Sequence, residues 1–144
     1  MGGFVKKKEG FRMNAYQDAV GVWTIGYGST KGVKEGDKIS LENAEKLLED
    51  ELRDFKHYVE RYSNRVGYYW NDNQVDALTS FIFNLGKGAL NQVTQDGTRS
   101  DEVIAEKMKL YYNAGGKKLK GLEIRRKEES DQFSAVPAAT GKSG

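Results

Sequence analysis

The sequence predicts an α+β fold in which a small antiparallel β lobe precedes a larger helical lobe and a long helix joins the two. Glycines and β-forming residues concentrate between residues 11 and 39, which is typical of short strands and tight turns. From Ser40 onward the apolar residues recur with a helical period instead. A chain of 144 residues is long enough for about one domain. This order of lobes predicts a cleft between them.

The elements of the β lobe follow from glycine positions and β propensity. Residues 3–10 predict a short helix that ends at Gly10. Residues 11–39 predict the β lobe, with a first turn at 18–21 and a strand over 22–25.

A long connecting helix is predicted over about residues 41–61. Ser40 is a suitable N-cap, and Glu42 lies in the first turn, where a negative charge is favourable. One face is apolar and consists of Leu41, Ala44, Leu47, Leu48, Leu52, Phe55 and Val59.

The helical lobe is predicted over about residues 62–133. Asn71 and Gln74 form a capping-box pattern at the start of a helix that Gly86 ends. Further along we expect a short helix over 87–93, a polar loop over 94–99, a helix from Ser100 to Gly115-Gly116, and a last helix over 119–133. Residues 134–144 are small and polar and predict a flexible tail. Trp23 and Trp70 are interpreted as packing residues.

Composition excludes several classes of function. The chain has no cysteine and a single histidine, His57, so thiolate chemistry, a zinc site and a Ser-His-Asp triad are not expected. We predict no metal and no cofactor. The 23 Lys and Arg residues nearly balance 21 Asp and Glu residues, which gives no reason to expect a nucleic-acid partner. No stretch is long and apolar enough for stable membrane insertion, and no signal peptide is evident.

If the chain is an enzyme, its acid–base groups are therefore carboxylates, lysines or tyrosines. Glu9 is predicted at a helix end, Asp18 in a turn and Thr24 at the start of a strand, and such positions can converge on one cleft. Two carboxylates in different environments are suited to cleaving a glycosidic bond, because one can donate a proton while the other activates water or attacks. The alternative is that Glu9 is a surface charge and Asp18 a turn former.

Residues 9–28, EGFRMNAYQDAVGVWTIGYG, resemble the signature of the phage-type lysozymes, the endolysins. The family pattern is E-G-x5-Y-x-D-x2-G-x2-T-I-G-Y-G, and all ten fixed positions are filled here. Similarity continues in NQVDALTSF at 73–81, FNLG at 83–86, NAGGKKLKGL at 113–122 and RRKEE at 125–129. The resemblance covers about residues 3–133 and implies a lysozyme-like fold with the active site in the cleft between the lobes.

The resemblance also implies roles for individual residues. Glu9 is then the general acid, and Asp18 and Thr24 hold or activate the attacking water. The implied reaction is hydrolysis of the β-1,4 bond between N-acetylmuramic acid and N-acetylglucosamine in peptidoglycan. Inversion is expected, and it requires carboxylates separated by roughly 6.5–9.5 Å. The residues expected to bind substrate are Tyr16, Tyr27, Gly28, Phe83, Asn84 and Arg125.

Some of these assignments have structural alternatives. Tyr16 and Tyr27 can be sugar platforms or core aromatics, and Gly28 can admit a sugar chain or simply form a bend. Arg125 or Arg126 is expected to face Glu9. Six basic residues between 117 and 127 can dock on the anionic wall or form a solvated helix face. The departures from the family pattern are Ser29, where many relatives have histidine, Ile124, where the family often has arginine, and the loop over 93–99.

The family further implies how such an enzyme reaches its substrate. We expect a monomer that is made in the host cytoplasm and reaches the periplasm or cell wall after a holin has permeabilised the membrane. Two alternatives are a lytic transglycosylase, which needs no water-holding Asp18, and a non-catalytic peptidoglycan-binding relative.

Overall fold

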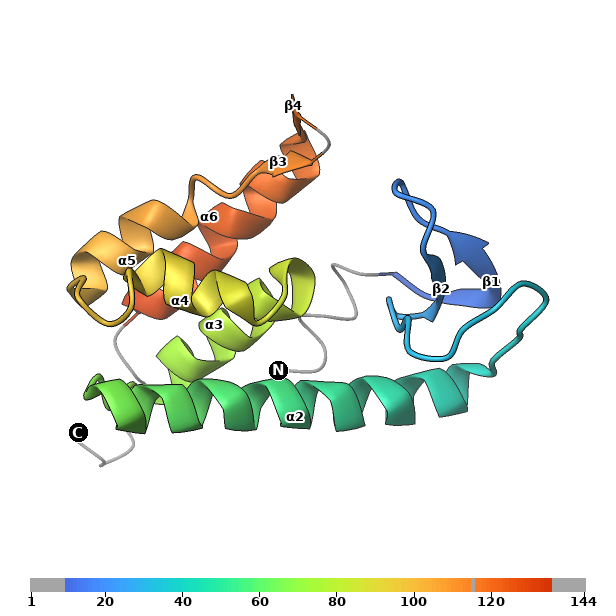
Figure 1. The fold of residues 1–144 in the computed structure, drawn as a ribbon, viewed down its shortest axis with the longest axis horizontal. Helices are drawn as coiled ribbons and strands as arrows, with labels where there is room; N and C mark the ends of the chain where they lie inside the picture. The colour runs from blue at the N-terminus through green and yellow to red at the C-terminus, as the bar shows by residue number, and fades with distance from the viewer. Residues whose placement is uncertain (1–9, 115, 136–144) are drawn as a thin grey trace. The chain divides into compact units, whose positions relative to one another are not determined.

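The computed structural model describes residues 10–114 and 116–135. The predicted helix at 3–10, except Gly10, lies outside the described residues, and this includes Glu9. All but the first two residues of the predicted tail also lie outside them. The chain divides into two compact units, one reaching to Asp54 and the other beginning at Phe55. The β-hairpin lies in the first unit and most helices lie in the second (Figure 1). The fold is α+β, as predicted.

The first unit contains the predicted antiparallel hairpin. Strand β1 (Arg12–Gln17) pairs with β2 (Trp23–Gly26), and Tyr16 stands opposite Thr24. The connecting turn is closed by hydrogen bonds from the Asp18 amide to the Val22 carbonyl (2.9 Å) and from the Gly21 amide to the Asp18 carbonyl (3.0 Å). The predicted first turn is therefore confirmed. The core of this unit is apolar and consists of Ile25, Tyr27, Ala44, Leu48 and Leu52.

The long helix α2 (Leu41–Val66) is 26 residues long and begins as predicted. The Ser40 hydroxyl accepts a hydrogen bond from the Asn43 amide at 3.1 Å. The predicted end near residue 61 is wrong, because the helix continues to Val66. There the amides of Gly67 and Tyr68 both donate to the Ser63 carbonyl at 2.9 Å, and Gly67 has φ +87°, a left-handed conformation that favours glycine at a helix end.

One member of the predicted apolar face of α2 is exposed. Leu41 is 51% exposed, because it is the first residue of the helix. The other members are buried or half-buried, so they mark the packed face of the helix. Ala44, Leu48, Leu52 and Val59 are buried, and Leu47 and Phe55 are half-buried.

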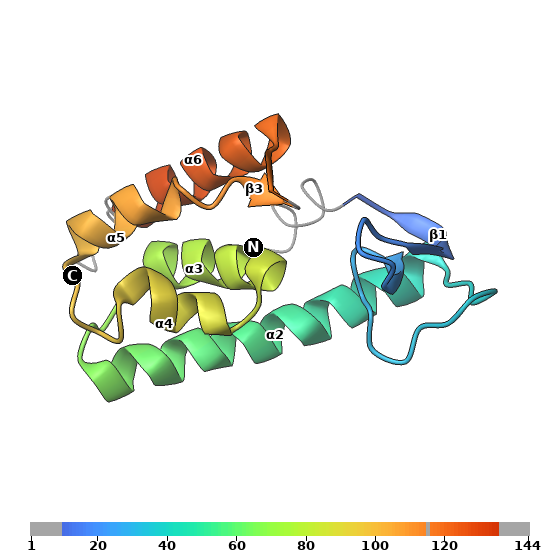
Figure 2. The ribbon, with the colours of Figure 1, turned by 45° about the horizontal axis from the view of Figure 1, so that its top comes forward.

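Four further helices build the second unit over the C-terminal half of α2. Figures 1 and 2 show α3 and α4 next to α2, with α5 and α6 on the far side of α3. Their bounds are α3 Asp72–Leu85, α4 Gly88–Thr94, α5 Asp101–Met108 and α6 Lys120–Ser134. The predicted capping box at Asn71 and Gln74 is present, and Gly86 ends α3. Helix α3 is central to this unit because seven of its residues are buried.

The predicted helix from Ser100 to Gly115-Gly116 is too long. Ser100 caps α5 as expected, but the helix ends at Met108. Turn hydrogen bonds follow, and strands β3 (Asn113–Ala114) and β4 (Lys117–Lys118) form a small hairpin. Gly116 has φ +80°, a conformation suited to a hairpin turn. The last helix includes Ser134, which the sequence placed in the tail.

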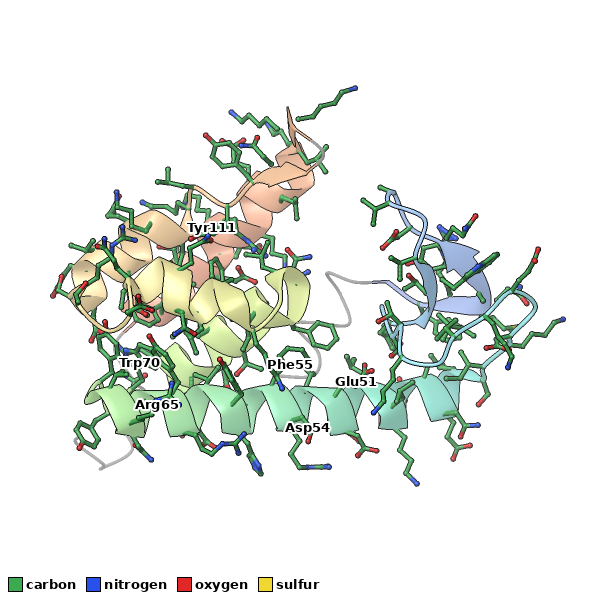
Figure 3. All side chains as sticks on the ribbon, viewed as in Figure 1. Glu51, Asp54, Phe55, Arg65, Trp70 and Tyr111 are labelled. Carbon is green, nitrogen blue, oxygen red and sulfur yellow. The ribbon has the colours of Figure 1, made fainter. Side chains whose placement is uncertain are left out.

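Trp70 packs in the core of the second unit, as predicted. Its ring stacks on Tyr68 with centroids 4.5 Å apart, and it meets Phe133 edge-on at 6.1 Å. The indole Nε1 donates to Asp101 Oδ1 at 2.9 Å. Trp70 therefore joins the end of α2 to α5 and α6. Figure 3 labels it beside Arg65 at that end of α2.

Candidate functional site

Asp18 is held in place by the backbone of the β-hairpin turn. Its Oδ1 accepts hydrogen bonds from the amides of Val20 and Val22, each at 2.9 Å. No hydrogen bond from the described part of the chain reaches its Oδ2. Two N–H donors fix the direction of the carboxylate.

Thr24 belongs to the same end of the hairpin. It is buried, and its hydroxyl donates to the Val22 carbonyl at 3.0 Å. Directly opposed residues in an antiparallel pair project on the same face, so Thr24 shares a face with Tyr16, and Asp18 follows Tyr16 by two residues. With its proton directed to Val22, the Thr24 oxygen can act as a hydrogen-bond acceptor.

The residues around the TIGYG run serve the packing of the first unit. The amide of Ile25 donates to the Ser29 carbonyl and the amide of Ser29 to the Ile25 carbonyl, both at 2.9 Å. Tyr27 is buried between these positions and packs on Phe11 with ring centroids 5.6 Å apart. Gly28 has φ +100°, so it forms a bend. Contacts of Tyr27 and Gly28 with substrate stay predictions.

Tyr16 is half-buried, unlike Tyr27. The guanidinium of Arg12 lies over its ring, 4.2 Å from the centroid. This cation–π contact fixes the ring on the surface of the hairpin. Binding of sugar by Tyr16 stays a prediction.

Ser29 has a partner that the sequence did not reveal. Its hydroxyl donates to Glu51 Oε1 of α2 at 2.8 Å. Burial raises the pKa of Glu51, with further contributions from Asp54 and Asp50, and the Ser29 hydrogen bond opposes the rise. The pair ties the TIGYG loop to α2, where Figure 3 labels Glu51. A separation of 22 residues between the partners left no local signal.

Phe83 and Asn84 lie near the C-terminal end of α3 in the second unit. The Phe83 ring meets Phe55 edge-on with centroids 5.4 Å apart, and Phe83 is half-buried while Asn84 is exposed. The ammonium of Lys87 lies 5.4 Å from the Phe55 ring centroid and 5.2 Å from that of Tyr58. Phe83 therefore belongs to an aromatic surface cluster, and its contact with sugar stays a prediction.

Arg125 is part of a buried charged network between α3 and α6. Its Nε donates to Glu129 at 3.1 Å, and its NH2 donates to the carbonyl and hydroxyl oxygens of Ser80, each at 3.2 Å. Arg126 Nε lies 3.0 Å from Glu129 Oε1. Burial raises the pKa of Glu129, and Arg126, the Ser80 hydroxyl and Arg125 oppose the rise. A substrate contact of Arg125 stays a prediction.

This network bears on the basic stretch over residues 117–127, which the sequence allowed to be either a docking surface or a solvated helix face. Arg125 and Arg126 are 4% and 0% exposed, so two of its six cations do not reach the surface. Lys118 pairs with Glu123 at 3.3 Å and Lys127 with Asp131 at 3.1 Å. Ion pairing and burial therefore use most of the charge in this stretch.

Within residues 10–114 and 116–135 the side chains form no cluster of His, Asp or Glu suited to a metal ion. None of the helices in that part of the chain combines the length and the apolar character needed to cross a membrane.

Comparison with known proteins identifies the family. The phage lysozyme family model matches residues 6–129. The chain is 34% identical to the endolysin of Salmonella phage P22 over 77% of this chain and 80% of the relative. It is 31% identical to an endolysin of Acyrthosiphon pisum secondary endosymbiont phage 1, over 92% and 93% of the two chains.

Solved structures agree with the sequence comparison. The muramidase domain of SpmX from Asticaccaulis excentricus has a TM-score of 0.79 at 31% identity, covering 94% of this chain and 95% of that domain. An endolysin from Escherichia coli O157:H7 phage FAHEc1 has a TM-score of 0.75 at 31% identity, over 94% and 92% of the two chains. The chain thus belongs to the phage lysozyme family and is a lysozyme-type glycoside hydrolase.

Proposed function

We propose that this chain is a muramidase that hydrolyses the β-1,4 bond between N-acetylmuramic acid and N-acetylglucosamine, with inversion. Glu9 donates the proton to the glycosidic oxygen. Asp18 activates the attacking water, and Thr24 helps to hold it. The substrate is the peptidoglycan of the host cell, and its hydrolysis lyses that cell.

The geometry of Asp18 carries this proposal. Two backbone amides bind one carboxylate oxygen at 2.9 Å, and the other oxygen has no hydrogen bond with the described residues. A carboxylate that only stabilised the turn would need no more than the first oxygen. The second can accept a proton from water while the hairpin holds the group in a fixed direction.

The test is digestion of purified peptidoglycan by wild type, Glu9→Gln and Asp18→Asn, with fragments analysed by mass spectrometry. We expect reducing N-acetylmuramic acid ends from wild type. Each variant should lose about 10²–10⁴-fold in rate, the range for removal of a general acid or base. The Asn side chain keeps an oxygen acceptor for the turn amides, so the fold should persist.

Asp37→Asn is the matched control, because Asp37 Oδ2 accepts the Lys34 amide at 2.9 Å in another turn of the same unit. It should retain activity. Anhydro-muramic ends would instead indicate a lytic transglycosylase, and no fragments from folded wild type would indicate a non-catalytic peptidoglycan-binding protein. NMR of fresh product, which resolves the anomers, tests inversion.

We further propose that the protein acts as a monomer made in the host cytoplasm and depends on a holin to reach the periplasm or wall. Sedimentation and lysis assays with and without membrane permeabilisation test these two points.

A further inference from the structure

Tyr69 is an exposed aromatic residue in a backbone conformation that does not suit it. Its φ is +55°, and the residue is 74% exposed. The left-handed region is unfavourable for any residue with a Cβ, and a bulky residue there is an outlier. Both chain neighbours are tied to the interior of the second unit. The Tyr68 hydroxyl donates to the Arg99 carbonyl at 2.7 Å, and the Trp70 amide donates to the Ser63 hydroxyl at 2.9 Å.

The described fold makes no use of the Tyr69 ring. No ring contact and no side-chain hydrogen bond joins it to the residues that the structure describes. Glycine or asparagine would adopt the same φ at lower cost and would expose less apolar area. Packing therefore does not account for a tyrosine at this position, and its ring is available to a ligand.

A concave site of about 290 Å³ adjoins this segment at Trp70, between the last turns of α2 and the start of α3. It is lined by Glu60, Ser63, Asn64, Trp70, Asp72 and Val75. Trp70, labelled in Figure 3, is held by the stack of its ring on Tyr68. The side chains of Glu60, Asn64 and Asp72 make no hydrogen bond or ion pair with the described part of the chain. The site thus combines a fixed wall with polar groups that the fold leaves unused.

The chemistry of the lining favours a neutral ligand rich in hydroxyl groups. The lining contains no lysine or arginine, so it does not suit an anion. Two carboxylates and an amide accept hydrogen bonds from O–H donors, and the Asn64 amide donates as well. The negative face of an aromatic ring attracts the partly positive C–H hydrogens of a sugar ring. Tyr69 and the unused polar groups therefore match the two faces of sugar chemistry, the apolar C–H face and the hydroxyl rim.

We propose that this site binds an N-acetylglucosamine unit of the glycan strand. The Tyr69 ring lies on the sugar, Glu60, Asn64 and Asp72 bind its hydroxyl groups, and the acetamido methyl group packs on Val75 and Trp70. An N-acetylmuramic acid unit carries a carboxylate, which the two carboxylates of the lining would repel.

All these residues belong to the second unit, and none of the residues proposed for catalysis is among them. The proposal rests on the proposed function, because it takes the glycan of peptidoglycan as the substrate and adds a second contact with the same strand.

The test is an NMR titration of the protein with the trisaccharide of N-acetylglucosamine. The chain has two tryptophans, so the indole N–H of Trp70 reports on this site and that of Trp23 on the β-hairpin. We expect a saturable shift of the Trp70 resonance. Tyr69→Asn should weaken the affinity read from Trp70 about three- to tenfold, the loss expected for one stacked ring. Tyr69→Phe keeps the ring and should bind as wild type does.

Gln95→Asn is the matched control, because Gln95 is another exposed residue with a left-handed φ, +51°. Both asparagine variants relieve backbone strain and should raise the urea midpoint of unfolding, but only Tyr69→Asn should weaken binding. Equal affinities of wild type and Tyr69→Asn, or no saturable shift of Trp70, would refute the proposal. A saturable shift with methylammonium at matched ionic strength, and none with the trisaccharide, would overturn it in favour of a site for organic cations.

The two proposals fail separately. Wild type that shifts Trp70 with the trisaccharide but releases no fragments from peptidoglycan would refute the muramidase activity and support the sugar site. Wild type that digests peptidoglycan without a Trp70 response would refute the sugar site alone.

Discussion

Gly26→Ala should destabilise the protein by about 2–5 kcal/mol, through two separable effects. Gly26 has φ +66°, and an L-residue in the left-handed region costs roughly 1–2 kcal/mol. A Cβ at this position would lie 3.2 Å from Ala44 Cβ on α2, and crowding of a packed core typically costs about 1–3 kcal/mol. Ala44 is 1% exposed, so it has little room to move away.

Gly21→Ala is the matched control. Gly21 has φ +88°, but its Cβ would meet nothing closer than Gln17 Nε2 at 4.0 Å. It should therefore show the backbone cost alone, roughly 1–2 kcal/mol. The difference between the two variants measures the contact with α2.

Urea unfolding, followed by circular dichroism and tryptophan fluorescence, gives the free energies of unfolding. Combining Gly26→Ala with Ala44→Gly removes the clash, so the double-mutant cycle should give a favourable coupling of about 1–2 kcal/mol. Equal losses for Gly26→Ala and Gly21→Ala, together with zero coupling, would show that close approach to α2 does not explain Gly26.

Three further outcomes concern polar groups that differ in burial. The Glu51 carboxyl has a raised pKa, so it holds its proton more tightly in the folded than in the unfolded chain, and its contribution to stability is lost as the pH rises through that pKa. Glu51→Gln keeps an acceptor for the Ser29 hydroxyl. It should therefore raise the urea midpoint of unfolding at pH 7 and leave it unchanged at a pH below the ordinary pKa of 4.5. An equal rise of the midpoint at both pH values would contradict this reasoning. Ser80→Ala removes a donor to Glu129 and an acceptor for Arg125 and should cost about 1–3 kcal/mol in urea unfolding. Asp131→Asn breaks only the exposed pair with Lys127 and should cost less than about 1 kcal/mol. Equal losses in the free energy of unfolding for Ser80→Ala and Asp131→Asn would argue against a structural role of the buried network of Ser80, Arg125 and Glu129.

Features that depend on neighbouring residues could be predicted from the sequence. The Asp18 turn, the Ser40 cap, the Asn71–Gln74 capping box and the glycine that ends α3 all arise from contacts within five residues. Such contacts leave a pattern of residue types at fixed spacing. The helix and strand periods likewise gave the α+β class and the order of the elements.

Features that depend on distant partners could not be predicted in this way. Helix α2 runs past residue 61 because the buried side chains of Tyr62 and Ser63 bond to later parts of the second unit. The Ser63 hydroxyl accepts a hydrogen bond from the Trp70 amide at 2.9 Å. The Tyr62 hydroxyl forms a hydrogen bond with the Thr94 hydroxyl. The end of α5 at Met108 could not be predicted either, because the helical spacing of apolar residues continues to Tyr111. Arg99, in a loop, and Lys107, at the end of α5, line the same surface concavity. Nothing in their spacing along the sequence predicts that they lie together.

The same distinction applies within the motif that identified the family. Gly26 lies close to α2, Tyr27 is buried, and Gly28 forms the bend beside Ser29, so packing alone accounts for these three positions. Thr24 is partly explained by its bond to the Val22 carbonyl. Asp18 has a carboxylate oxygen, its Oδ2, that accepts no hydrogen bond from the described residues, while Oδ1 accepts the two turn amides. A protein with the same fold and no activity would therefore retain the glycines and Tyr27 but have no need of that oxygen. Asp18→Asn, which preserves the turn and removes the charge, thus separates the chemistry of the motif from its architecture.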